Sequence, residues 1–242
     1  SGKAKVKILK IDEENEVYRI LYTLTAMVSD RANELTDNMH LIEKLDYFFS
    51  KGRLSIELDA VEPKIKLDRQ INLCDARHPL MDRETDVPLT FELGNTYRGV
   101  VITGPNTGGK TVAIKTVMLN LVMAQCGLHI CCKNADICMN SGYFCDIGDG
   151  QNISDNLSTF SSHIKNVLNI LKEIDENSFV IMDELGSGTD PQEGMGIAIS
   201  ILEKLLESKA NFLVTTHYPE VKEYAGKNEG IENARMTFDK DT

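Results

Sequence analysis

The chain has 242 residues, of which 42% are hydrophobic and 26% charged, and its formal net charge is −11. This composition is typical of a globular protein with one sizeable core, or one core and a smaller appended domain. No apolar run approaches the roughly 18–20 residues of a membrane helix, which excludes a membrane-spanning protein, and the acidic balance argues against a surface-wide grip on nucleic acid phosphates.

The cysteines indicate the cellular compartment, and the first residues indicate whether the chain is a fragment. Six cysteines are present, and none stands in a Cys-x-x-Cys pair of the kind that binds zinc. Several lie in apolar stretches, where a reduced cysteine behaves as a small hydrophobic residue. We therefore expect free thiols and a cytoplasmic location. The chain opens with Ser1-Gly2 and not with Met, so we expect a fragment of a longer protein.

The first expected domain, residues 1–66, is predicted to be a helical arm. Between Glu14 and Ser50 apolar residues recur at spacings of three, four and seven, as they do on one face of a helix. A single helix of this length would reach roughly 50 Å at 1.5 Å per residue, which is the shape of a lever. The alternative is two helices packed on the core, with a break near Asp30 or Asp37.

The second expected domain, residues 67–242, is predicted to have an α/β fold. Short β-type runs alternate with helical stretches, which indicates a largely parallel sheet flanked by helices. The expected strands are 67–73, 89–93, 100–103, 179–182 and 212–215, and the expected helices are 112–125, 164–174 and 194–207.

An eight-residue motif stands between the expected strand 100–103 and the helix after it. It fits G-x-x-x-x-G-K-[ST], the phosphate-binding P-loop, in the strand–loop–helix context that this motif requires. Its glycines let backbone N–H groups close around phosphate oxygens. Lys110 places an ammonium against the β- and γ-phosphates, and the Thr111 hydroxyl can ligate Mg²⁺. The motif consists of Gly104, Pro105, Asn106, Thr107, Gly108, Gly109, Lys110 and Thr111.

Two further strand ends carry polar side chains. Asp183 and Glu184 follow the buried strand 179–182, where the Asp can hold Mg²⁺ with its water shell and the Glu can polarise an attacking water. His217 follows the strand 212–215, where it can contact a γ-phosphate or position the water. The sequence therefore predicts an Mg²⁺-dependent ATPase with Lys110, Glu184 and His217 as catalytic residues and with Thr111 and Asp183 as metal ligands.

For two loops, helix capping is an alternative to a functional role. Asp190, Pro191 and Glu193 occupy the N-cap, N1 and N3 positions of the next helix, and capping alone could explain Asp190. The hydroxyl-rich stretch 156–162 precedes the helix expected from Ile164. Its hydroxyls either satisfy free N–H groups of that helix or bind an anion there.

Together these motifs resemble the ATPase domain of the MutS family, the mismatch-repair ATPases, within the broader ABC class. The chain contains, in this order, Arg77-His78-Pro79, Gly-Pro-Asn-x-Gly-Gly-Lys-Thr, Ser-Thr-Phe, Asp-Glu-Leu-Gly-x-Gly-Thr and Thr-His-Tyr. Finer features, among them Val112 directly after the P-loop and Asp146-Ile147-Gly148-Asp149, resemble the second MutS subfamily, the bacterial paralogue without the mismatch-reading domain. The resemblance covers about residues 14–242.

The resemblance implies a homodimer with two-fold symmetry and ATP bound between the subunits, so that Ser158 and Thr159 act on the partner's nucleotide. It implies that residues 1–66 are the end of a lever leading to a DNA clamp. It also implies that Asp86-Val87-Pro88 grips the adenine, with Val87 where the family often has an aromatic residue, and that Val112 belongs to the nucleotide site. Full-length members carry a nuclease-like Smr domain, of which this sequence shows nothing, so the resemblance assigns no nuclease activity to this chain.

Two function classes remain open. In the first, the ATPase drives a clamp that acts on branched DNA and controls recombination. In the second, the same ATPase acts on stalled or collided ribosomes. An SMC-like ATPase is a third alternative, which the Ser-Thr-Phe segment disfavours because an SMC head would show a Leu-Ser-Gly-Gly type of signature. The absence of an Asn-Lys-x-Asp guanine motif disfavours a GTPase.

Overall fold

The computed structural model of the chain describes residues 2–94, 96–104, 109–148 and 156–236, with only the backbone of residues 156–160 and 162. It divides into two compact units, Ser1–Arg53 and Leu54–Thr242. Within the described ranges, no helix combines the length and the apolar character needed to cross a membrane.

The first unit is helical. Helix α1 spans Gly2–Ser29 and helix α2 spans Ala32–Glu57, with a turn at Asp30 and Arg31 between them. The sequence left open one long helix or two helices packed on the core. The structure has two helices, divided at the first of the two expected positions, but without the burial that packing on the core would give. None of the residues of α1 or α2 is buried.

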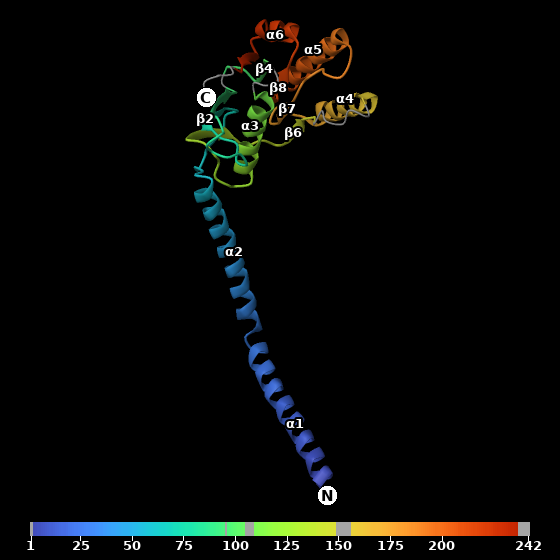
Figure 1. Ribbon diagram of the computed structural model, residues 1–242. Helices are drawn as coiled ribbons and strands as arrows, with labels where there is room; N and C mark the ends of the chain where they lie inside the picture. The colour runs from blue at the N-terminus through green and yellow to red at the C-terminus, as the bar shows by residue number, and fades with distance from the viewer. Residues whose placement is uncertain (1, 95, 105–108, 149–155, 237–242) are drawn as a thin grey trace. The chain divides into compact units, whose positions relative to one another are not determined.

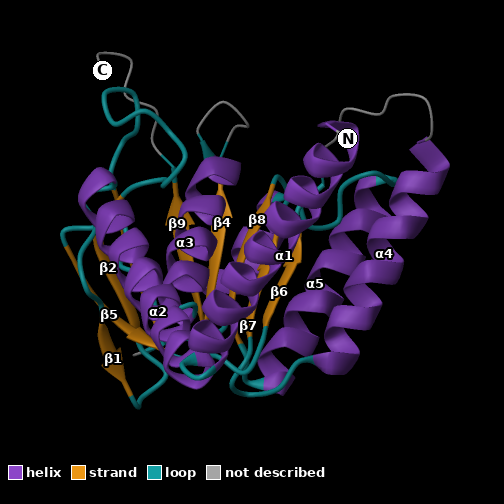
Figure 2. Cartoon of the chain, turned by 90° about the horizontal axis from the view of Figure 1, so that it is seen from below, coloured by secondary structure: helices purple, strands orange, loops and turns teal. Residues whose placement is uncertain are grey.

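A five-stranded sheet forms the centre of the second unit. Its strands, in spatial order, are β6 (Tyr143–Asp146), β7 (Phe179–Met182), β8 (Asn211–Thr216), β4 (Gly99–Thr103) and β9 (Ile231–Arg235). All four pairings are parallel, so the carboxyl ends of these strands lie along one edge of the sheet (Figure 2).

A second, mixed sheet has four strands. Their spatial order is β1 (Lys64–Lys66), β5 (Asn134–Cys138), β2 (Ile71–Ala76) and β3 (Leu89–Leu93). The β1–β5 pair is parallel and the other two pairs are antiparallel. The register of β2 against β3 shifts between Leu73 and Ala76.

The layers follow from the alternation of side chains along the buried strands. On β4, Val100 and Ile102 belong to the apolar cluster shared with helix α3 (Lys110–Gln125) and the mixed sheet. Val101, between them, belongs to the opposite cluster, shared with α4 (Asn156–Glu173), α5 (Pro191–Ser208) and α6 (Pro219–Gly226). The parallel sheet is therefore covered on both faces, as Figure 1 shows for α3 and α5, and its inner strands β4, β7 and β8 are almost fully buried.

The structure confirms the predicted α/β class with mixed and parallel sheets flanked by helices. The expected strands 89–93, 100–103, 179–182 and 212–215 are present. Strand β2 lies at 71–76 and not at 67–73, and α4 begins at Asn156 rather than near Ile164. Strands β1, β5, β6 and β9 and helix α6 were not expected from the sequence.

Candidate active site

The three motif-bearing loops meet at the carboxyl edge of the parallel sheet. Gly104 follows β4, Asp183 follows β7 and His217 follows β8. Because β7, β8 and β4 are adjacent in the sheet, these loops lie side by side. Pro105, Asn106, Thr107 and Gly108, four of the predicted P-loop residues, lie outside the described residues.

The start of α3 has the backbone that a phosphate loop needs. Gly109 is the N-cap of α3 and has φ 77° and ψ 18°, a left-handed conformation that glycine adopts without strain. Gly104 has φ 143°. No described side chain caps α3, so the first N–H groups of this helix are available to an anion.

Lys110 lies inside the site. Only 2% of it is exposed, and its Nζ donates to the Gly104 carbonyl over 2.5 Å and lies 3.3 Å from Nδ1 of His217. Burial lowers the pKa of Lys110, while the carboxylates of Glu184 and Asp183 act to raise this pKa. A buried ammonium needs negative partners, and the Gly104 carbonyl and the carboxylates of Glu184 and Asp183 are partners of this kind.

Asp183 is held by two hydroxyls from different elements. Its Oδ2 accepts a hydrogen bond of 2.7 Å from Thr111, and its Oδ1 accepts one from Thr215. The Thr215 hydroxyl in turn accepts the N–H of Glu184 at 2.8 Å. Thr215 thus supports both acidic residues, a role that the sequence analysis did not assign. Its signal was a threonine near the end of the buried strand that leads to His217.

The donor set at this point fits Mg²⁺. Thr111 and Asp183 offer two oxygens that are 2.7 Å apart. Mg²⁺ prefers oxygen ligands and takes one or two of them from a protein, with water and substrate phosphate supplying the rest. Within the described part of the chain, no cluster of three or more His, Cys, Asp or Glu side chains forms a metal site of another kind.

Glu184 adopts an unusual backbone conformation next to His217. Its φ is 50°, which is uncommon outside glycine and is strained for a side chain of this size. The Leu185 N–H donates to the Thr215 carbonyl at 2.8 Å and fixes the turn. The Oε1 atom of Glu184 lies 3.6 Å from Nε2 of His217, and both side chains are about two fifths exposed. A carboxylate and an imidazole therefore face each other where water can reach them.

The turn after Glu184 is locked by a close approach. Gly186 has φ 82°, and the Tyr218 hydroxyl donates to its carbonyl at 3.0 Å. A Cβ on Gly194 would lie 2.3 Å from the Gly186 oxygen, so only glycine fits there. The expected cap at Asp190 is present, since its carboxylate accepts the Gln192 N–H at 3.0 Å.

The remaining predicted residues lie elsewhere. Ser158 and Thr159 lie in the first turn of α4, and their side chains are outside the described part of the chain. Val87 is 76% exposed and Val112, in the first turn of α3, is 39% exposed. Next to Val87 the Asp86 carboxylate accepts the His78 N–H at 2.7 Å, which fixes this loop.

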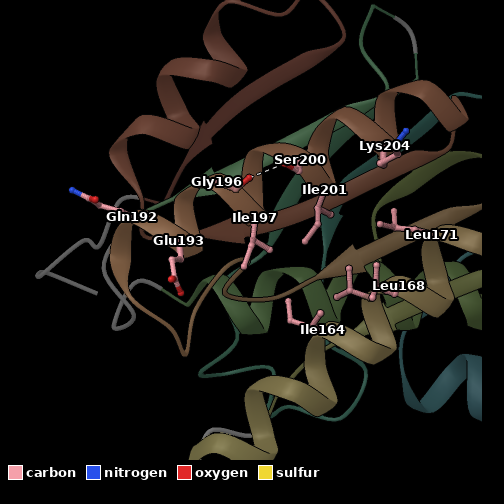
Figure 3. Close-up of a pocket in the computed structure, with 11 residues that line it drawn as sticks. Ile164, Leu168, Leu171, Gln192, Glu193, Gly196, Ile197, Ser200, Ile201 and Lys204 are labelled. Atoms are coloured by element: carbon pink, nitrogen blue, oxygen red, sulfur yellow. Dashed lines mark hydrogen bonds between the residues drawn. The ribbon is translucent and has the colours of Figure 1, made fainter.

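An apolar groove lies between α4 and α5 (Figure 3). Its volume is about 620 Å³, and its walls include Ile164, Leu168 and Ile197, with Glu193 and Lys204 toward its two ends. None of the residues predicted to bind phosphate or metal lines it. The groove is therefore separate from the cluster of Lys110, Thr111, Asp183, Glu184 and His217.

Comparison with known proteins decides the family. The family model for MutS domain V matches residues 100–242. The chain belongs to the MutS family. The matched region contains the clustered residues from Lys110 to His217. It is therefore a MutS-type ATPase domain.

Curated MutS-family relatives are similar over almost the whole chain. The protein named Endonuclease MutS2 from Clostridioides difficile is 46% identical over 98% of this chain and 30% of the relative. The proteins of the same name from Alkaliphilus oremlandii and Brevibacillus brevis are each 44% identical over the same shares. The chain therefore spans about 30% of the length of these relatives. The predicted resemblance to the second MutS subfamily, here as a fragment, is confirmed.

Proposed function

We propose that the carboxyl edge of β4, β8 and β7 binds ATP with Mg²⁺ and hydrolyses it. The observation that carries this proposal is the convergence of one ammonium, two carboxylates and one imidazole from three neighbouring strand ends. Lys110 and Thr111 follow β4, Asp183 and Glu184 follow β7, and His217 follows β8. These are the groups that phosphoryl transfer to water requires, since its catalysis is mainly positioning and charge stabilisation.

Each residue has a defined task in this proposal. The P-loop 104–111 and the amino end of α3 hold the phosphates, and Lys110 neutralises charge on the β- and γ-phosphates. Thr111 and Asp183 hold Mg²⁺, which when bound neutralises phosphate charge. Val112, in the first turn of α3, lies beside the phosphates, and Val87 contacts the base.

Glu184 is proposed as the general base. Its carboxylate accepts the proton of a water whose oxygen attacks the γ-phosphorus, while the bond to the β-phosphate oxygen breaks and ADP leaves with that electron pair. His217 lies 3.6 Å from Glu184 and 3.3 Å from Lys110. From this position it contacts the γ-phosphate and orients the water.

The assembly proposed around this site is a homodimer. ATP is bound between two subunits, and Ser158 and Thr159 at the start of α4 act on the partner's nucleotide. Residues 1–66 serve as the end of a lever, and ATP turnover drives a clamp that acts on branched DNA. The relatives are named endonucleases; for this chain we propose the ATPase part of such a protein and assign it no nuclease activity.

The catalytic assignment is tested with Glu184→Gln. The amide keeps the shape of the side chain but cannot take a proton, so we expect unchanged ATP binding and a steady-state hydrolysis rate reduced by about 100-fold or more. Glu193→Gln, the same change in the first turn of α5, is the matched control and should hydrolyse ATP normally. Undiminished hydrolysis by a folded Glu184→Gln protein would move the role of base to His217.

The partner is tested by copurification of the full-length protein from cells. Branched DNA recovered with the protein, and enriched by Glu184→Gln because turnover is blocked, supports the clamp on DNA. Recovery of ribosomes in place of DNA would contradict it and favour the alternative partner.

A further inference from the structure

Asp146 joins two elements of the proposed site. It is the last residue of β6, and its backbone carbonyl accepts the N–H of Asp183 at 2.8 Å. Its side chain is only 12% exposed and points to α4. The Nδ2 of Asn166 donates to Oδ1 at 2.8 Å, and Nδ1 of His163 lies 3.3 Å from both carboxylate oxygens. All described side-chain partners of this buried carboxylate belong to one helix.

These contacts are made in the amino-terminal part of α4. Farther along the helix, Val167 and Ile170 bury their side chains in the core. His163 is on the amino-terminal side of this apolar packing, and Thr159 precedes it in the helix by about one turn. The polar contact to Asp146 therefore fixes the part of α4 nearest to Ser158 and Thr159 (Figure 1 shows α4 beside β6).

The backbone next to Asp146 leaves room for the histidine ring. A Cβ added to Gly148 would lie 2.5 Å from Cε1 and 2.8 Å from Nε2 of His163. Such distances require one of the two groups to move. Position 148 thus offers a way to displace the ring from Asp146 without altering either partner.

We infer that Asp146 and His163 are positioning residues that set where α4 presents Ser158 and Thr159 to the nucleotide of the partner subunit. The inference rests on the proposed function. Through its carbonyl Asp146 contacts the proposed metal ligand of its own subunit, and through its carboxylate it holds the helix that serves the other subunit. Asp146 therefore links the residues that serve the subunit's own nucleotide site to the helix that serves the partner's site.

The decisive variant is His163→Ala, which cuts the contact on the α4 side only. We expect it to lower ATP turnover about tenfold or more, because small misplacements of catalytic groups have effects of this size. ATP binding to the P-loop of the same subunit should stay within about twofold of wild type. The matched control is His129→Ala, which removes another histidine contact, 2.7 Å from Ser55 Oγ, and should leave turnover unchanged.

Mixing subunits separates positioning from general damage. A dimer of His163→Ala and Lys110→Ala subunits has one site with both defects and one site with neither. Equal mixing should restore about a quarter of wild-type activity, since half of the dimers are mixed and each has one intact site. If His163→Ala damaged the sheet instead, the P-loop of the same subunit would also be inactive, and the mixture would recover no activity.

A second mixture distinguishes failure of the inference from failure of the proposed function. Ser158→Arg mixed with Lys110→Ala tests the trans arrangement itself, with tagged copurification to show that mixed dimers form. If this mixture does not recover, the proposed dimer function is wrong. If it recovers and the His163→Ala mixture does not, or if His163→Ala has wild-type turnover, the inference is overturned.

Gly148→Ala provides an independent variant that keeps the histidine. It should show the same complementation by Lys110→Ala, because its methyl group displaces the ring. The double variant Gly148→Ala with His163→Ala should be no slower than His163→Ala alone, since both changes remove one contact. Additive losses in turnover would overturn the inference, and Gly148→Ala carries the test if His163→Ala does not fold.

Discussion

The Thr111 hydroxyl donates a hydrogen bond of 2.7 Å to Oδ2 of Asp183 and joins the first turn of α3 to the end of β7. Because this proton is committed to Asp183, the lone pairs of the Thr111 oxygen face away from the carboxylate. The two proposed metal ligands are therefore oriented before an ion binds, which reduces the ordering cost of binding.

Lys110→Ala should abolish nucleotide binding and leave the fold intact. The Lys110 ammonium contacts the Gly104 carbonyl and His217 at the proposed phosphate site and not the apolar core, so we expect the variant to fold. ATP affinity, measured by calorimetry, should fall about 100-fold or more because the phosphates lose a charge-assisted partner. Lys115→Ala, one turn farther along α3, is the control. Equal ATP affinity in Lys110→Ala and wild type would refute the phosphate-binding assignment.

Thr215→Val should affect both stability and turnover. Valine has a similar shape, but it cannot donate to Asp183 or accept the Glu184 N–H. Unsatisfied buried groups typically cost about 1–3 kcal/mol, which thermal unfolding would measure. Turnover should fall about tenfold because both acidic residues lose a support.

The control for this variant is Thr116→Val. Thr116 is also buried, and among the described residues its hydroxyl donates to the Val112 carbonyl alone, within α3, at 2.8 Å. It should lose some stability and no activity. Normal turnover by Thr215→Val would show that the hydroxyl bridge is not needed for catalysis.

This chain should bind DNA poorly at physiological salt. Its net charge is −11, and the densest basic cluster is the short run of Lys3, Lys5, Lys7 and Lys10 in α1. Few neutralised phosphates mean weak affinity and a shallow salt slope, so we expect a Kd of about 10 µM or weaker. In the proposed function the grip on DNA belongs to the clamp beyond the lever.

Fluorescence anisotropy tests this expectation with duplex and four-way-junction DNA at two salt concentrations. Each titration is repeated with a non-hydrolysable ATP analogue. Submicromolar binding at about 0.15 M salt, where the screening length is about 8 Å, would instead place a DNA site on the ATPase domain.

Five of the six free thiols should fall into two classes of reactivity, with the half-buried Cys74 between them. Cys126 and Cys145 are exposed, whereas Cys131, Cys132 and Cys138 are buried. Burial raises the pKa of Cys132 to about 12, so near pH 8.5 fewer than about one in a thousand of these side chains is the reactive thiolate. Thiol titration should show Cys126 and Cys145 reacting first and the buried three only on unfolding. Fast labelling of Cys132 in folded protein would contradict this packing.

The sequence predicted the elements whose local pattern and tertiary surroundings agree. Strands β4, β7 and β8 each contain an unbroken apolar run of at least three residues, and the predicted P-loop motif has a fixed spacing. Strand β9 was missed because its residues Ile231–Arg235 alternate polar groups at an edge, and its strand character comes from pairing with β4. The start of α4 was missed because its first turns are rich in Ser and Thr, and the amphipathic pattern begins at Ile164.

Within the site, spacing predicted the residues but not their supports. Lys110, Asp183 and His217 converge because each follows a parallel strand that ends at the same edge of the sheet. Each of the three was recognised from its position in a sequence motif. The contacts of Thr215 and of Asp146 depend on which strands are neighbours, which no local pattern in the sequence encodes. No functional role was predicted for His163, and its contact with Asp146 depends on strand β6, which was not predicted either.

At position 184 the left-handed backbone favours a different residue from the one that the proposed chemistry needs. Relaxed residues for this φ are glycine and asparagine, so a redesign that sought only a higher melting temperature would choose one of them. That choice would release strain of about 1 kcal/mol and remove the carboxylate that faces His217. A sequence optimised for folding alone would therefore yield a more stable domain without its proposed base.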